Sequence, residues 1–212
     1  MTIKAVIFDM DGTIFDVPYD WSKIKADLET QGKPILPYLS HLEEPEKSKK
    51  WRVLEKYESQ ATQKAVLKQG MKEFLDFLAQ KKIKQALVTN NARRNVTYLL
   101  DKFDLRFDCV ISRERGLWKP SGAPFFAVLE ELGIQSEEAC VIGDSPFDIL
   151  AARESGIARV FILSKDKKRF ASFDVEVFSS VDALKLRLKD LISAGMTGQD
   201  GNVFRPSGKK SR

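Results

Sequence analysis

Apolar and polar residues follow one another along the chain in blocks that predict strands alternating with helices. Five short runs of β-branched, aromatic and aliphatic residues have the length of buried strands: 5–8, 85–88, 107–111, 139–142 and 159–163. Between and after them, apolar side chains recur at helical spacing over 71–80, 90–102, 124–132, 147–154 and 181–191. Parallel strands need such crossover helices, so the pattern predicts an α/β fold, a doubly wound parallel sheet with helices on both faces.

The pattern changes between residues 16 and 69. This stretch is rich in charge, carries apolar residues at helical spacing around Trp51, and contains no convincing strand. Three prolines would divide it into shorter helices. We therefore expect a core domain built from 1–15 and 70–192, with a small α-helical cap domain, 16–69, inserted into it.

The end of the chain differs from both domains. Residues 193–212 are rich in glycine, serine and charge, lack apolar periodicity and carry an excess of basic side chains. The composition predicts a disordered basic tail, which we expect to keep the chain soluble rather than to bind nucleic acid.

Composition and charge limit the classes of ligand and location. The 212 residues carry 35 basic and 30 acidic side chains, mixed along the chain, for a net charge of +5. This balance favours small anionic ligands over nucleic acid. No run of about 18 uncharged apolar residues is present, and the first apolar run, 3–8, is too short for a signal-peptide core. With two cysteines, both inside strand runs, we expect no disulfide, no membrane association and a cytoplasmic protein, monomeric or homodimeric.

Polar residues that could carry chemistry follow the predicted strands at their carboxyl ends, where doubly wound sheets bind ligands. In chain order the candidates are Asp9, Asp11, Gly12, Thr89, Asn90, Lys119, Asp144 and Asp148. Four carboxylates on adjacent loops would repel one another unless a cation compensates, and a set of oxygen ligands suits Mg²⁺. The single histidine, His41, and the two cysteines do not form a zinc site.

Each of these motifs has a structural explanation when taken alone. Asp-x-Asp-Gly occurs in turns and calcium loops, although here a strand precedes it and no glutamate stands at the twelfth position of an EF-hand. Asp144 could belong to a turn, Asp148 could cap a helix, and Lys119 could simply be solvated. Their joint occurrence, each after its own predicted strand, favours a catalytic site.

The motifs also carry a family resemblance. In chain order they are Asp9-x-Asp11-Gly12-Thr13, Thr89, Lys119 and Gly143-Asp144-x-x-x-Asp148. This set resembles the haloacid-dehalogenase-like phosphatase superfamily and is most similar to its phosphoglycolate-phosphatase-like branch. The resemblance covers roughly 1–15 and 70–165, and the position of the helical insert matches that of the family's small cap. Within the insert the resemblance is architectural only.

The resemblance implies a role for the acidic residues. Asp9 would be the nucleophile that forms an aspartyl phosphate, and Asp11 the general acid and then the general base. Mg²⁺ would be bound by Asp9, Asp144 and the backbone carbonyl of Asp11, and by Asp148 through water.

It also implies how phosphate is held. Thr89, the side chain of Asn90 and Lys119 would contact the transferring phosphoryl group, and Gly12 would let the chain turn beneath it. The implied activity is Mg²⁺-dependent hydrolysis of a small-molecule phosphomonoester, because a helical cap that closes the cleft favours small substrates over proteins. Phosphoglycolate is the first candidate, with sugar phosphates, nucleoside monophosphates and pyrophosphate open.

Other functions stay open on the core motifs. A phosphosugar mutase of the same family would use all four of them, and a phosphonate hydrolase would add a cap lysine such as Lys23, Lys25 or Lys33. A dehalogenase is disfavoured because that branch lacks the residue equivalent to Asp11. A non-enzymatic binding protein on this fold is the alternative from another class, and the intact motif residues argue against it.

Overall fold

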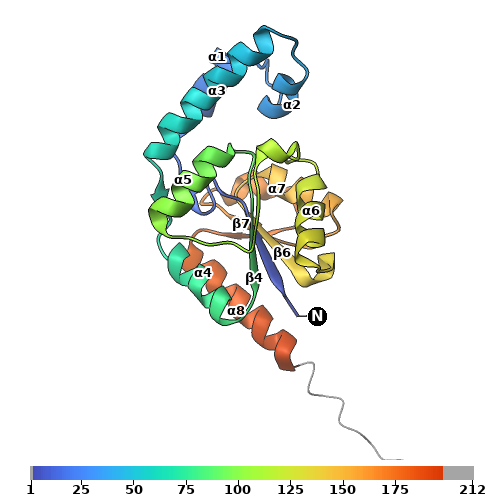
Figure 1. Cartoon of the computed structure of the whole chain (residues 1–212). Helices are drawn as coiled ribbons and strands as arrows, with labels where there is room; N and C mark the ends of the chain where they lie inside the picture. Colours follow the sequence, from blue (N-terminus) through green and yellow to red (C-terminus); the bar gives the residue numbers. More distant parts are fainter. Residues whose placement is uncertain (1, 198–212) are drawn as a thin grey trace, which may run out of the picture.

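The computed structural model describes residues 2–197 and has a six-stranded parallel sheet at its centre (Figure 1). The strand order is β5-β4-β1-β6-β7-β8, and every neighbouring pair is parallel. The strands are β1 (Ala5–Phe8), β4 (Lys84–Val88), β5 (Cys109–Ile111), β6 (Ala139–Gly143), β7 (Arg159–Leu163) and β8 (Glu176–Phe178). This confirms the predicted doubly wound sheet.

Helices cover both faces of the sheet, and each face has its own apolar core. One core includes side chains of α4 (Met71–Gln80), α5 (Arg93–Phe103) and α8 (Val181–Thr197); the other includes those of α6 (Ala123–Leu132) and α7 (Pro146–Glu154). Short 3₁₀ turns, η1 (Arg113–Arg115), η2 (Ser136–Glu138) and η3 (Lys167–Phe170), complete the core. Successive β1 residues point into opposite cores, which is why β1 is apolar at every position.

The helices α1 (Trp21–Asp27), α2 (Ile35–Ser40) and α3 (Glu46–Gln63) form a separate layer beyond the carboxyl ends of the strands (Figure 1). They enclose a small core of their own, made of Ile24, Leu28, Leu36, Leu39 and Leu54. Pro34 and Pro45 stand directly before α2 and α3, as helix-breaking residues should. Pro37 lies in the first turn of α2, where its missing N–H removes no helical hydrogen bond.

The expectation of no strand within 16–69 is wrong at both ends of that stretch. A two-stranded antiparallel sheet, β2 (Phe15–Asp16) with β3 (Val66–Leu67), closes the base of the helical layer. Two-residue strands are too short to give an alternating pattern, and their pairing spans some fifty residues of sequence.

Two further differences lie in the last quarter of the chain. The edge strand β8 was not predicted, because only three residues, none of them fully buried, belong to it. The last helix, α8, continues to Thr197 and includes the start of the predicted disordered tail. Gly195 lowers the stability of a helix by only about 1 kcal/mol relative to alanine, so a single glycine does not end it. The rest of that predicted tail, 198–212, lies outside the described residues.

The strand order reverses between β1 and β6. From β1 the chain moves through β4 to β5 on one side, then crosses by way of α6 to β6 on the other side of β1. Ligands of doubly wound folds bind at this switch point, beyond the carboxyl ends of the strands. The residues that follow β1 and β6 therefore occupy the position where a site is expected.

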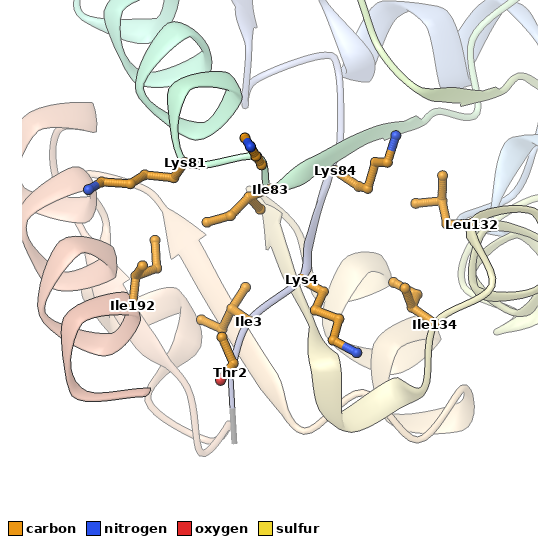
Figure 2. Close-up of a pocket in the computed structure, with 10 residues that line it drawn as sticks. Thr2, Ile3, Lys4, Lys81, Ile83, Lys84, Leu132, Ile134 and Ile192 are labelled. Carbon is orange, nitrogen blue, oxygen red and sulfur yellow. The ribbon is translucent and has the colours of Figure 1, made fainter. Parts of the chain in front are cut away.

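A hollow of about 360 Å³ lies at the amino ends of the strands, on the side of the sheet opposite the switch point (Figure 2). Residues that precede β1, residues that lead into β4 and the end of α8 contribute to it; its lining is Thr2, Ile3, Lys4, Lys81, Lys82, Ile83, Lys84, Leu132, Ile134 and Ile192. It is thus separated from the strand ends that carry the candidate residues. Between residues 2 and 197, none of the helices has the length and apolar character that crossing a bilayer requires.

Candidate active site

Three of the predicted acidic residues meet at the switch point. One carboxylate oxygen each from Asp9, Asp144 and Asp148 lies within 4.8 Å of the other two. The register of the sheet explains this: Phe8 pairs with Ile142, and the Asp9 backbone N–H donates to the Ile142 carbonyl at 2.9 Å, so the loops after β1 and β6 start side by side.

Lys119 joins this cluster from the loop before α6. Its ammonium donates to Asp9 Oδ1 at 2.5 Å, to Asp148 Oδ1 at 2.6 Å and to the Val88 carbonyl at 3.2 Å, and the residue is only 3% exposed. Burial alone would lower the pKa of Lys119, but the carboxylates of Asp148 and Asp9 outweigh it and raise that pKa. The ammonium therefore stays charged beside Asp9.

Both carboxylate oxygens of Asp148 accept hydrogen bonds within the chain. Oδ1 accepts from Lys119, and Oδ2 accepts from the backbone N–H groups of Asp144 and Ser145 and from the Ser145 hydroxyl, at 3.2, 3.0 and 2.8 Å. Asp148 forms the capping box of α7 with Ser145, which confirms that it caps a helix. It contacts Lys119 at the same time. Asp148 offers a carboxylate oxygen to the acidic cluster, and its predicted contact with a cation through water stays a prediction.

Gly12 and Gly143 have no room for a side chain. Gly12 has a φ of +86°, and a Cβ there would lie 2.1 Å from Asp144 Oδ2. A Cβ on Gly143 would lie 2.3 Å from Asp148 Cγ. In the structure the group that approaches Gly12 is the carboxylate of Asp144, and the predicted turn of the chain beneath phosphate stays a prediction.

Thr89 and Asn90 follow β4 and lie beside the cluster. The Thr89 hydroxyl accepts from the Asn91 backbone N–H at 3.0 Å. The Asn90 amide makes two bonds of 2.9 Å with the Lys119 backbone, one donated to its carbonyl and one accepted from its N–H. The Asn90 side chain thus holds the Lys119 loop in place, and its predicted contact with phosphoryl oxygens stays a prediction.

Sequence reasoning assigned no role to Asn91, the next residue. Its Nδ2 donates to Asp11 Oδ2 at 2.9 Å and to the Tyr19 hydroxyl at 2.8 Å, which links Asp11 to the chain entering α1. Its place directly after the Thr89-Asn90 strand end was the only signal in the sequence.

A buried ion pair that the sequence did not reveal joins α3 to η1. Arg113 donates to both carboxylate oxygens of Glu58 at 2.6 and 2.8 Å, the two side chains are about 5% exposed, and the guanidinium lies 5.0 Å from the ring centre of Trp51. The partners are 55 residues apart, and no local pattern marks such a contact. The pair fastens the helical layer over the strand ends that carry Asp11.

Comparison with known proteins decides the family. The model of the haloacid dehalogenase-like hydrolases matches residues 18–162, more than half of the chain. The chain belongs to this hydrolase family. The resemblance noted from the four motifs is thereby confirmed.

Individual relatives of this hydrolase agree with the assignment. The haloacid dehalogenase-like hydrolase domain-containing protein At2g33255 of Arabidopsis thaliana is 28% identical over 162 residues, which are 70% of this chain and 66% of the plant protein. The putative pyrophosphatase PpaX of Caldanaerobacter subterraneus is 33% identical over 187 residues, covering 76% of this chain and 82% of that protein. A solved structure described as a predicted phosphoglycolate phosphatase from Haemophilus somnus has a TM-score of 0.68 at 22% identity, over 88% of this chain and 99% of its own.

The donor set of the hydrolase fits a divalent cation. Burial raises the pKa of Asp9 to about 6, of Asp144 to about 7 and of Asp11 to about 8. Repulsion from the Asp9 carboxylate also raises the pKa values of Asp144 and Asp11. Repulsion from Asp148 raises those of Asp9 and Asp144. The Lys119 ammonium pairs with Asp9 and Asp148, and its one positive charge is fewer than the three negative charges that Asp9, Asp144 and Asp148 carry when ionised. Clustered carboxylates that lack enough positive charge, with oxygen donors only, are the environment that a hard divalent ion relieves.

The metal-free hydrolase is expected to lose stability as the pH rises from about 4 to about 8. The folded-state pKa values of Asp9, Asp11 and Asp144 lie above their ordinary 3.8, so across this window the folded protein retains protons that the unfolded chain has released. A divalent ion binds the deprotonated carboxylates, so the rise in melting temperature that Mg²⁺ causes should grow with pH. Thermal unfolding in EDTA and in Mg²⁺, at stepped pH, measures both; Asp144→Asn should lose most of the Mg²⁺ effect, and an effect of equal size at every pH would contradict the prediction.

Proposed function

We propose that this hydrolase is a Mg²⁺-dependent phosphatase that cleaves a small-molecule phosphomonoester by way of an aspartyl phosphate on Asp9. The observation that carries the proposal is the contact between Asp9 and Lys119 within the acidic cluster at the switch point. A carboxylate is itself a nucleophile when ionised, and the Lys119 ammonium at 2.5 Å offsets part of the burial that raises the pKa of Asp9. The same ammonium would attract the phosphoryl oxygens of the substrate.

The other residues take roles that follow from their contacts. Asp11 has a raised pKa and a buried oxygen, Oδ1, without a hydrogen-bond partner among the described residues, so it is suited to give a proton to the leaving oxygen and later to take one from water. Mg²⁺, held by Asp9 and Asp144, would neutralise phosphoryl charge as the nucleophile approaches. Thr89, 2% exposed beside Asp9's strand, would contact the phosphoryl group, and Asp148 and Asn90 would hold Lys119 in position.

The helical layer supports a small substrate. Glu58–Arg113 and Asn91–Tyr19 tie α3 and the segment before α1 to the core next to Asp11, so a protein-sized substrate would have to break these bonds to reach Asp9. Phosphoglycolate remains the first candidate on the resemblance of the motifs. Pyrophosphate is the second, because a relative with 33% identity carries the name of a putative pyrophosphatase.

The test is phosphate release by the purified chain. We expect hydrolysis of p-nitrophenyl phosphate with Mg²⁺ and its loss in excess EDTA, with recovery when Mg²⁺ is restored. A panel of phosphoglycolate, sugar phosphates, nucleoside monophosphates and pyrophosphate then identifies the preferred substrate by kcat/KM. Turnover that is unchanged in EDTA would refute the metal dependence, and a requirement for a sugar bisphosphate would indicate a phosphosugar mutase instead.

A further inference from the structure

The orientation of the Asn91 side chain is fixed by groups on the far side from Asp11. Its Oδ1 accepts from the Ala92 backbone N–H at 2.7 Å and from Asn95 Nδ2 at 2.8 Å. A backbone N–H can only donate, so the atom facing Ala92 must be the amide oxygen. The NH₂ end therefore faces Asp11, and the side chain, on a residue 3% exposed, has no freedom to turn over.

This orientation divides the two oxygens of Asp11 between two tasks. Oδ2 lies 2.9 Å from Asn91 Nδ2 and must accept, because an amide N–H has no lone pair to offer in return. Asn91 thus holds one oxygen of Asp11, and Oδ1 is the oxygen left to meet a substrate. Within residues 2–197, that oxygen is buried and has no hydrogen-bond partner.

We propose that Asn91 is a positioning residue that holds the Asp11 carboxyl group by Oδ2, so that Oδ1 faces the leaving oxygen of the substrate. The inference rests on the proposed function, in which Asp11 is the general acid. The terminal torsion of an aspartate is broad and nearly two-fold, so without Asn91 the Asp11 carboxyl group would turn and Oδ1 would no longer be held toward the leaving oxygen. The Thr89 hydroxyl accepts a hydrogen bond from the Asn91 backbone N–H, which fixes Asn91 to the end of β4 beside the proposed phosphoryl site.

The choice of leaving group separates this role from a merely structural one. An alkyl phosphate releases a strongly basic alkoxide unless a proton is supplied, whereas p-nitrophenolate leaves without one. The ratio kcat/KM covers the steps up to departure of the alcohol and excludes hydrolysis of the aspartyl phosphate, which is common to all substrates. Comparing kcat/KM for an alkyl and an aryl ester thus isolates protonation of the leaving oxygen.

We therefore expect Asn91→Ala to reduce kcat/KM by about 100-fold for the preferred alkyl phosphate but by less than about threefold for p-nitrophenyl phosphate. Asn91→Asp, which keeps the acceptor for Ala92 and removes the donor to Asp11, should show the same selective loss. Asn95→Ala leaves the donor to Asp11 in place but loosens it, and should give a smaller selective loss. Tyr19→Phe removes the other acceptor of Asn91 Nδ2 and should keep the wild-type ratio between the two esters.

An equal loss on both esters in folded Asn91→Ala, judged by its circular dichroism and melting temperature, would assign Asn91 a structural role and overturn the proposal. If Asn91→Ala does not fold, the ratio measured for Asn95→Ala decides: a selective loss supports the proposal, and an unchanged ratio overturns it. A wild-type protein that hydrolyses neither ester would refute the proposed function itself, and with it this inference.

Discussion

Asp9→Asn is expected to reduce phosphate release by at least about 10³-fold, with p-nitrophenyl phosphate as with the preferred substrate. The amide oxygen of asparagine is uncharged and a poor nucleophile, so the aspartyl phosphate cannot form. Single-turnover and steady-state assays with Mg²⁺ measure the loss. Because no leaving group can compensate for a missing nucleophile, the loss should be similar for alkyl and aryl esters, unlike that expected for Asn91→Ala.

The stability of Asp9→Asn distinguishes lost chemistry from lost folding. Burial raises the pKa of Asp9 to about 6, which means that the folded protein disfavours its ionised form. Removing that charge should leave the melting temperature in EDTA at or above the wild-type value, while Lys119 keeps its bond to Asp148. Asp76→Asn makes the same chemical change on the exposed face of α4 and should alter neither property. An active Asp9→Asn would refute the covalent mechanism, and an inactive but unfolded one would leave stability as the cause.

The position of the acidic residues was predictable because it depends on local signals. Asp9 and Asp144 each end a short, fully apolar run, and the carboxyl ends of parallel strands meet at one edge of the sheet. The run at β1 could be recognised as a central strand because residues buried on both faces must all be apolar. The strands that were not predicted, β2, β3 and β8, have two or three residues each and too little burial to leave such a run.

The partners of the polar side chains could not be predicted in the same way. Asn90 and Asn91 are adjacent and chemically identical, yet one binds the backbone of Lys119 and the other binds Asp11. Which neighbour each meets depends on how the loop after β4 lies against two loops that are distant in sequence. The Glu58–Arg113 pair depends likewise on the packing of α3 over the core, so sequence spacing contains no trace of it.

Lys119→Met is expected to lower both activity and stability. Methionine has a similar length but no charge, so Asp9 and Asp148 would face each other in a buried site without their shared ammonium. Removing one partner of a buried ion pair costs about 3 to 5 kcal/mol of unfolding free energy. Loss of the fixed charge near the phosphoryl group should reduce kcat by about 10²- to 10³-fold in protein that remains folded. Denaturant unfolding in EDTA and steady-state kinetics with saturating Mg²⁺ measure the two effects separately.

Magnesium should restore more stability to Lys119→Met than it adds to the wild type. With the ammonium gone, a bound divalent ion becomes the main compensation for the carboxylate cluster, so its binding should contribute more to the folded state. The kinetic defect should persist even then, because an ion held by Asp9 and Asp144 does not restore the ammonium that bridges Asp9 and Asp148. Lys72→Met, on the exposed surface of α4, is the matched control and should change neither stability nor rate. Full recovery of kcat in Mg²⁺ would show that Lys119 only balances charge in the fold; recovery of stability alone would assign it to the reaction as well.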